Sequence, residues 1–247
     1  MTVIAKSMVD LPRYGIILML GAWLIFSWVD TGAKWLAVAG IPAFQLAFMR
    51  YAGHFVISIA VIAKGGFKLD RFKTRHLWQV ISRALLLVSA TLSNFYALQF
   101  LPLTVVSAIM FSSPVVVCFL SVSILREEVG PWRWSAILLG FIGVLIVVRP
   151  FGTTFHPAML MIIYNAIALA LYSLMTRRLS GIVAVETMQF YMGLVGTLLM
   201  LPFAIWVWTQ PATTWGMLVL ISLGVLGWAG HQLLTNAHRF GLSLIHI

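Results

Sequence analysis

The feature that most constrains this chain is a series of eight stretches long and apolar enough to cross a lipid bilayer. They cover residues 14–36, 43–63, 78–98, 104–124, 133–149, 157–176, 184–208 and 214–237. An α-helix needs about 20 mostly apolar residues to span the hydrocarbon core. The stretches lack the strict two-residue alternation of membrane β-barrel strands. Because 62% of the residues are hydrophobic and only 9% are charged, the sequence predicts an all-α integral membrane protein.

The basic residues are distributed unevenly between the two sets of loops. Loops on the side of the N-terminus carry Lys6, Arg13, Lys64, Lys68, Arg71, Lys73, Arg75, Arg126, Arg133, Arg177, Arg178 and Arg239. The opposite loops carry only Arg149. By the positive-inside rule, this asymmetry predicts a multi-pass protein of the cytoplasmic (inner) membrane with its N-terminus in the cytoplasm. The distribution of the basic residues thus relates the net charge of +10 to the lipid bilayer, and no nucleic-acid partner is expected.

The middle of the chain divides it into two related halves. The segment RPFGTTFHP at 149–157 contains the Pro and Gly residues typical of a connecting loop. On either side of it, YALQF at 96–100 aligns with NAHRF at 236–240, sharing an Ala and a Phe at an offset of 140 residues. Five apolar stretches precede the joint, so the second half must enter the membrane from the opposite side. This arrangement predicts an inverted-topology repeat of the kind that many secondary transporters use.

Residues 100–150 carry further sequence marks. They include the LPL entry at 101–103, a Ser-Pro pair within the fourth stretch, a Leu-x-Glu before a basic-aromatic turn, and G-x-x-G-V-x-x-x-x-x-P at 140–150. Together with FMRY at 48–51 and RALLLVSATLSNFYALQF at 83–100, they resemble the EamA domain of the drug/metabolite transporter superfamily. The resemblance implies ten helices, built as two inverted repeats around a central substrate pathway. It places a first EamA repeat of five helices at 14–150 and a second repeat, with only three helices, at 154–241.

The last six residues, LSLIHI at 242–247, do not continue this pattern, because Gly241 is followed at 242 by a Leu where the repeat predicts a counterpart of Pro102. A transposon-end adapter used in sequencing libraries encodes the same hexapeptide. We therefore expect 242–247 to be non-native read-through. Without helices nine and ten, part of the cavity wall would be missing. On that basis we expect this 247-residue fragment to be inactive and assign the predicted activity to the parent gene.

Charged residues within the first two stretches are the first candidates for a functional site. Asp30 lies about ten residues before the centre of the intervening loop and Arg50 about ten after it, so the two reach the same depth. An unpaired ion inside a membrane helix is costly, which favours a partner or a wet cavity. One hypothesis is that Asp30, Lys34 and Arg50 line the pathway and bind substrate or a coupling proton. The alternative is a permanent Asp30–Arg50 lock, with Lys34 reaching outward.

Polar residues in the other stretches are further candidates. They are Asn94 and Tyr96, then Ser112 and Ser113 beside the hinge candidate Pro114, then Tyr164, Asn165 and Tyr172, and finally His231. A proline frees a backbone carbonyl, which a neighbouring hydroxyl can satisfy or a ligand can use. The alternative is that these groups only kink a helix or bond between helices. Arg83, near the end of its stretch, is expected to extend toward the membrane surface.

Enzyme chemistry has no visible motif in this chain. There is no G-x-S-x-G, H-E-x-x-H or Gly-rich phosphate loop, and the single cysteine excludes an internal disulfide. No metal or cofactor is expected. The sequence predicts a secondary transporter of small organic metabolites, such as amino-acid-like, nucleobase-like or amphipathic solutes, working by alternating access with proton coupling or exchange. A passive channel or a structural membrane subunit is the alternative, and a homodimer is left open.

Overall fold

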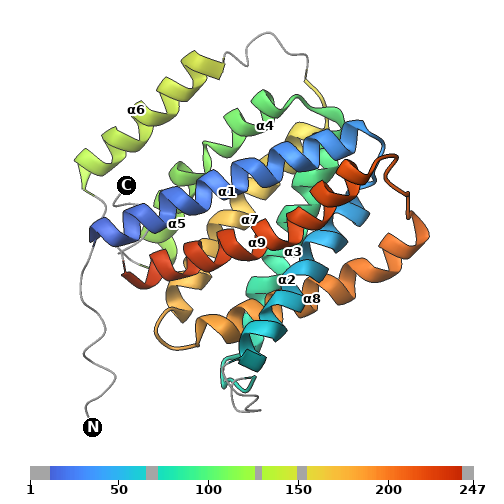
Figure 1. Ribbon diagram of the computed structural model, residues 1–247. Coiled ribbons are helices and arrows are strands. Elements are labelled where there is room, and N and C mark those ends of the chain that lie inside the picture. The colour runs from blue at the N-terminus through green and yellow to red at the C-terminus, as the bar shows by residue number, and fades with distance from the viewer. Residues whose placement is uncertain (1–11, 65–71, 126–129, 149–154, 241–247) are drawn as a thin grey trace.

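The computed structural model describes residues 12–64, 72–125, 130–148 and 155–240, and helices are the only regular structure within those ranges. The helices are α1 (Pro12–Val38), α2 (Ala43–Lys64), α3 (Leu77–Phe100), α4 (Leu103–Met110), α5 (Ser113–Leu125), α6 (Pro131–Val148), α7 (Ala158–Leu179), α8 (Val185–Trp206) and α9 (Thr214–Phe240). Within these residues, seven apolar spans are long enough to cross a membrane, with Leu103–Val122 forming one of them. The prediction of an all-α membrane bundle is therefore confirmed (Figure 1).

The fifth predicted stretch, 133–149, forms α6 at the edge of the bundle, against α4 and α5 (Figure 1). Within the part of α6 that is described in full, the apolar section is Trp134–Gly143. The whole helix, Pro131–Val148, has 18 residues and rises about 27 Å at 1.5 Å per residue, close to the roughly 30 Å hydrocarbon core. An eighth membrane span at this position therefore stays a prediction.

The fourth predicted stretch, 104–124, is broken in the middle. Helix α4 ends at Met110 and α5 begins at Ser113, with a turn between them. Pro114 has no N–H to continue the helical bonding of the preceding turn. In this turn the Oγ of Ser112 donates to the carbonyl of Ile109 at 2.6 Å. The kink expected at the Ser-Pro pair is present, whereas a hinge motion there stays a prediction.

Helix α2 crosses both α8 and α9, and glycines set how closely these helices approach. A Cβ on Gly53 of α2 would lie 2.8 Å from the Cα of Gly224 on α9, so the two backbones touch. Gly196 of α8 faces the ring of Tyr51 and likewise has no room for a side chain. Small residues permit such close contacts between membrane helices. The crossings hold the polar residues of α2, including Arg50, at the centre of the bundle.

The neighbours of the long helices form a regular pattern. Helix α1 packs chiefly against α9, α2 against α8, and α3 against α7 (Figure 1). The first three helices correspond to α7, α8 and α9 in that order. Under this correspondence the α1–α9 pair becomes the α7–α3 pair, the α2–α8 pair maps onto itself, and the α2–α9 contact becomes the α8–α3 contact. The predicted repeats at 14–150 and 154–241 would be related by this correspondence. Their division into domains stays a prediction, since the joint at 149–154 and the segment 241–247 lie outside the described residues.

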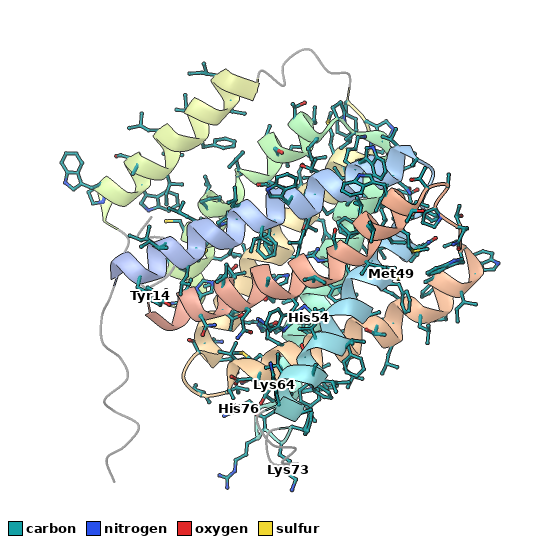
Figure 2. The ribbon with its side chains drawn as sticks, viewed as in Figure 1. Tyr14, Met49, His54, Lys64, Lys73 and His76 are labelled. Carbon is teal, nitrogen blue, oxygen red and sulfur yellow. The ribbon has the colours of Figure 1, made fainter. Side chains whose placement is uncertain are left out.

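One end of the bundle collects basic side chains. Lys64 ends α2, and Lys73 and His76 precede α3, at the lower edge of the view in Figure 2. The other basic residues of the long loop at 65–71 lie outside the described residues, as do Arg126, Glu127 and Glu128. Basic residues at this end are consistent with the predicted cytoplasmic side.

Candidate functional site

A cavity of about 70 Å³ lies inside the bundle, between helices of both halves of the chain. Its polar lining consists of Asp30, Arg50, Thr91, Asn94, Ser113, Asn165, Ser173 and His231. Apolar and aromatic side chains complete the wall, among them Trp23, Phe26 and Leu87. Since a water molecule needs about 10–15 Å³ of such space, the cavity admits roughly five waters. Six of the twelve residues singled out from the sequence therefore lie around one internal space.

Asp30 and Arg50 both face this cavity but do not bond to each other. The Oδ1 of Asp30 accepts a hydrogen bond from the Nδ2 of Asn94 at 2.9 Å. Among the residues described, no ion pair joins Asp30 to Arg50 within 4 Å; Arg50 is instead held by neutral groups. The ion pair of the proposed Asp30–Arg50 lock is therefore not formed in this structure, and the lock stays a prediction. Two opposite charges border the same space, each with hydrogen-bonding capacity left.

Arg50 is held in place by α3 and α9. Its Nη1 donates to Thr91 Oγ1 at 3.2 Å, and its Nη2 lies 3.1 Å from His231 Nε2. The guanidinium also sits 5.6 Å from the ring centroid of Phe95, while its buried Nε has no partner. A guanidinium can only donate, so the Nε2 of His231 must accept. This assigns His231 as the neutral tautomer with its proton on Nδ1.

The proton on His231 extends the network away from the cavity. With Nδ1 as donor, His231 bonds to the Oη of Tyr172, 3.1 Å away. The same Oη accepts a hydrogen bond from Nη2 of Arg83 at 2.6 Å. Tyr172 is fully buried and is not part of the cavity lining. A continuous chain of hydrogen bonds thus links Arg50, His231, Tyr172 and Arg83.

Lys34 takes neither of the positions expected from the sequence. Its Nζ donates to the carbonyls of Leu98 and Leu101, at 2.7 and 2.9 Å. These carbonyls belong to the end of α3, where helical carbonyls lack internal partners and a positive charge is favourable. Lys34 therefore caps α3 and neither shares the Asp30 carboxylate nor reaches outward. The sequence could not show this, because it requires α1 to lie beside the end of α3.

The remaining candidates separate into two groups. Ser113 and Asn165 line the cavity, and the Nδ2 of Asn165 lies 3.2 Å from the sulfur of Met110. Tyr96 is 40% exposed and Tyr164 45% exposed. The hydroxyl of Tyr164 donates to the Oγ of Ser89, the ring of Tyr96 packs on Phe100, and Ser112 bonds to its own backbone turn. These three residues lie outside the lining of the cavity.

Arg83 is the clearest residue that the sequence interpretation misplaced. It is 0% exposed and does not extend to the membrane surface. Its position on α3 could have indicated this, because Arg83, Leu87, Thr91 and Asn94 recur at helical spacing and share one face. Thr91 and Asn94 both line the cavity. A basic residue on the cavity-facing side of a helix is directed into the bundle.

Comparison with known proteins shows which family the chain belongs to. The EamA-like transporter family model matches residues 13–149. The chain belongs to this family. The resemblance drawn from the residues at 83–150 is thus confirmed, and a member of this family is a small-molecule transporter rather than an enzyme.

Named relatives of this EamA-like transporter move different compounds. It is 27% identical over 217 residues to the S-adenosylmethionine uptake transporter of Rickettsia prowazekii, covering 86% of this chain and 71% of that protein. It is 32% identical over 219 residues to the riboflavin transporter of Vibrio cholerae, covering 87% and 72%. It is 26% identical over 231 residues to the pseudopaline exporter CntI of Pseudomonas aeruginosa, covering 92% and 79%. All three are named as transporters of small molecules.

A solved crystal structure supports the same fold. It matches with a TM-score of 0.74 at 18% identity, over 92% of this chain and 79% of that one. At this level of identity the likeness concerns the arrangement of the helices. Together with the seven membrane-length spans, it shows a multi-pass membrane protein with an EamA-type helical bundle.

Proposed function

We propose that this protein is a secondary carrier of the bacterial cytoplasmic membrane, with its N-terminus in the cytoplasm. It moves small organic solutes by alternating access. The observation that carries this proposal is the cavity, which is lined by helices of both halves and bordered by Asp30 and Arg50 without an ion pair between them. In carriers built from inverted repeats, the substrate site lies where the two repeats meet.

The neighbour pattern of the helices supports alternating access. Because the main helix contacts are preserved when the two halves are exchanged, the halves can move relative to each other and reach two equivalent arrangements. The cavity admits only about five waters in this structure. An organic solute therefore needs the helices to separate, and the broken α4–α5 segment, which contributes Met110 and Ser113 to the lining, is expected to move.

The lining favours an amphipathic solute with a charged or zwitterionic head. Arg50 has a buried Nε without a partner, and Asn94 has a buried Oδ1 without one. The rings of Trp23 and Phe26 offer an apolar surface beside them. An amino-acid-like head with an aromatic or apolar tail satisfies both kinds of surface, and nucleobase-like solutes can stack on the rings.

Proteoliposome transport distinguishes a carrier from the alternatives. The complete product of the gene is reconstituted, and radiolabelled amino acids, nucleobases and vitamins are screened for uptake and for counterflow. A carrier shows saturable uptake and counterflow stimulated by internal solute. Unsaturable flux with no counterflow would instead establish the passive channel, and no flux of any solute would favour the structural subunit.

Variants of the cavity charges then separate binding from coupling. Arg50→Gln is expected to raise the half-saturating concentration about tenfold or more, because a charge-assisted hydrogen bond contributes about 1.5–3 kcal/mol. Asp30 is the only carboxylate in the described cavity lining. Asp30→Asn is therefore expected to abolish accumulation driven by a proton gradient while counterflow persists. Lys64→Gln, at the exposed end of α2, is the control, and accumulation unchanged in Asp30→Asn would exclude proton coupling at this residue.

A further inference from the structure

A second polar cluster lies in the bundle, centred on Arg83. The Nε of Arg83 donates to Thr176 Oγ1 at 2.6 Å, and its Nη2 donates to the hydroxyls of Tyr172 and Thr235 at 2.6 and 3.4 Å. Its guanidinium carbon sits 4.4 Å from the centroid of the Tyr172 ring. The Nη1 group, which carries two N–H donors, is buried without any partner.

Further buried polar groups of α2, α8 and α9 lie near this guanidinium. Gln189 of α8 donates to the same Thr235 hydroxyl at 3.5 Å, and its Oε1 has no partner. His54 of α2 is 1% exposed, lies beside Gln189, and has an unpartnered Nε2. His238, one turn beyond Thr235, is close enough to interact with the charge of Arg83, and both of its ring nitrogens are unpartnered. Figure 2 shows His54 in the middle of the bundle, where α9 and α2 cross.

The charge of this cluster is not balanced within the described part of the chain. Asp30 and Glu186 are the only carboxylates there; Asp30 lies in the cavity and Glu186 is exposed at the start of α8. The partners of Arg83 are neutral hydroxyls. Burying a cation without a counter-charge is unfavourable. The two free N–H donors of Nη1 suit a small anion, because a charge-assisted hydrogen bond to an anion is stronger than one between neutral groups.

The cluster is separate from the cavity and is connected to it. Arg83 does not line the cavity, and it lies eight residues before Thr91 on α3, about 12 Å along the helix axis. The connection runs through the hydrogen bonds from Arg50 to His231 and from His231 to Tyr172. Two buried arginines thus stand at different depths of the bundle, joined by one histidine and one tyrosine.

We propose that Arg83 is the centre of a second anion-binding site on the transport pathway. Its ligand is a carboxylate or another small monovalent anion, bound by Nη1 with His54 or His238 as a further donor. The claim that this anion is part of the carried solute rests on the proposed function. The claim that Arg83 binds an anion does not. An inorganic anion and a solute carboxylate share this chemistry, and the experiment separates them.

Anion binding is measured on the purified protein in detergent by the unfolding temperature, followed by tryptophan fluorescence. Sodium acetate or sodium chloride replaces a bulky sulfonate salt at constant ionic strength. The comparison is made in the Arg50→Gln background, so that the cavity arginine does not contribute. That variant is expected to retain a saturable rise with acetate. Adding Arg83→Gln is expected to weaken the apparent affinity by about tenfold or more, the loss of a charge-assisted contact.

Controls distinguish the site from general charge effects. Arg178→Gln removes one positive charge from the exposed end of α7 and is expected to leave the acetate response unchanged. Arg83→Lys keeps the charge but not the Nη1 donors, and is expected to weaken binding less than Arg83→Gln. If Arg83→Gln does not fold, Arg83→Lys carries the test, and an affinity equal to that of its parent overturns the proposal. A response to acetate alone assigns a solute carboxylate, and a response to chloride assigns an inorganic anion.

Two further outcomes separate this proposal from the carrier function. No anion response in the Arg50→Gln parent, or an equal response after Arg83→Gln, overturns the second site while counterflow of the unaltered protein leaves the carrier intact. An Arg83-dependent response in a protein without counterflow supports the anion site and contradicts the carrier function.

Discussion

The tautomer assigned to His231 makes a quantitative prediction about its coupling to Arg50. If Nε2 accepts from the guanidinium at 3.1 Å, the two side chains attract each other. Removing either partner leaves a buried polar group of the other unsatisfied. The single variants Arg50→Met and His231→Phe are each expected to destabilise the protein by about 2–4 kcal/mol, from one lost charge-assisted bond and one weaker one.

The double variant carries the test. Once both partners are apolar, neither is left with a buried unsatisfied group, so the two losses should not add. The double variant is expected to lose about 1.5–3 kcal/mol less unfolding free energy than the two single variants lose together. This is the range for a hydrogen bond to a charged group. Equilibrium unfolding in mixed micelles, titrated with a denaturing detergent and followed by tryptophan fluorescence, gives the three differences.

The sign of the coupling energy decides between protonation states. If His231 carried a proton on Nε2, two donors would face each other, and removing one would relieve repulsion. A coupling energy of zero or of the opposite sign would therefore refute the assigned tautomer. The control cycle combines His231→Phe with Arg178→Met, since Arg178 is exposed and shares no hydrogen-bonding partner with His231. That cycle is expected to be additive within about 0.5 kcal/mol.

Three further predictions concern the bundle. Lys34→Met removes the cap of α3 and should destabilise the protein by about 2–4 kcal/mol in the same unfolding assay, whereas Lys64→Met at the exposed end of α2 should change it little. Gly53→Ala places a Cβ 2.8 Å from a backbone carbon of α9. It should cost about 1–3 kcal/mol, while Gly143→Ala, which meets nothing within 4 Å, should be neutral or slightly stabilising. Pro114→Ala should restore helical bonding and slow counterflow at unchanged expression; an unaltered rate would show that the kink is only structural.

The membrane fold was predictable because it depends on local properties. A run of apolar residues must become a helix in lipid, since each backbone group needs a partner within its own segment. The stretches at 43–63 and 78–98 therefore agree closely with α2 (Ala43–Lys64) and α3 (Leu77–Phe100). The break in the fourth stretch was also predictable, because it depends on Pro114 within the stretch itself. How α2 crosses α9 at Gly53 was not predictable, since the partner glycine lies 171 residues away.

The candidate site was predictable only in part. Asp30 and Arg50 were found because charges are rare and costly within membrane spans. The hairpin estimate placed them at the same level, and both line one cavity, but it did not give their partners. Asn94 satisfies Asp30, and His231 and Thr91 hold Arg50. These partners come from other helices, and hydropathy carries no information about which faces of two helices meet.

The sequence by itself determined the class of the protein, its spanning helices and its family, because these follow from apolar length, charge distribution and short motifs. The tertiary structure decided what each buried charge bonds to. Lys34 became a helix cap, although the sequence placed it either on the pathway or outward, and Arg83 became the centre of a buried polar cluster, although the sequence indicated an outward orientation. The physical reason is that a charged side chain in a membrane protein takes whichever polar partner the neighbouring helices offer. Those neighbours are set by helix packing over the whole bundle.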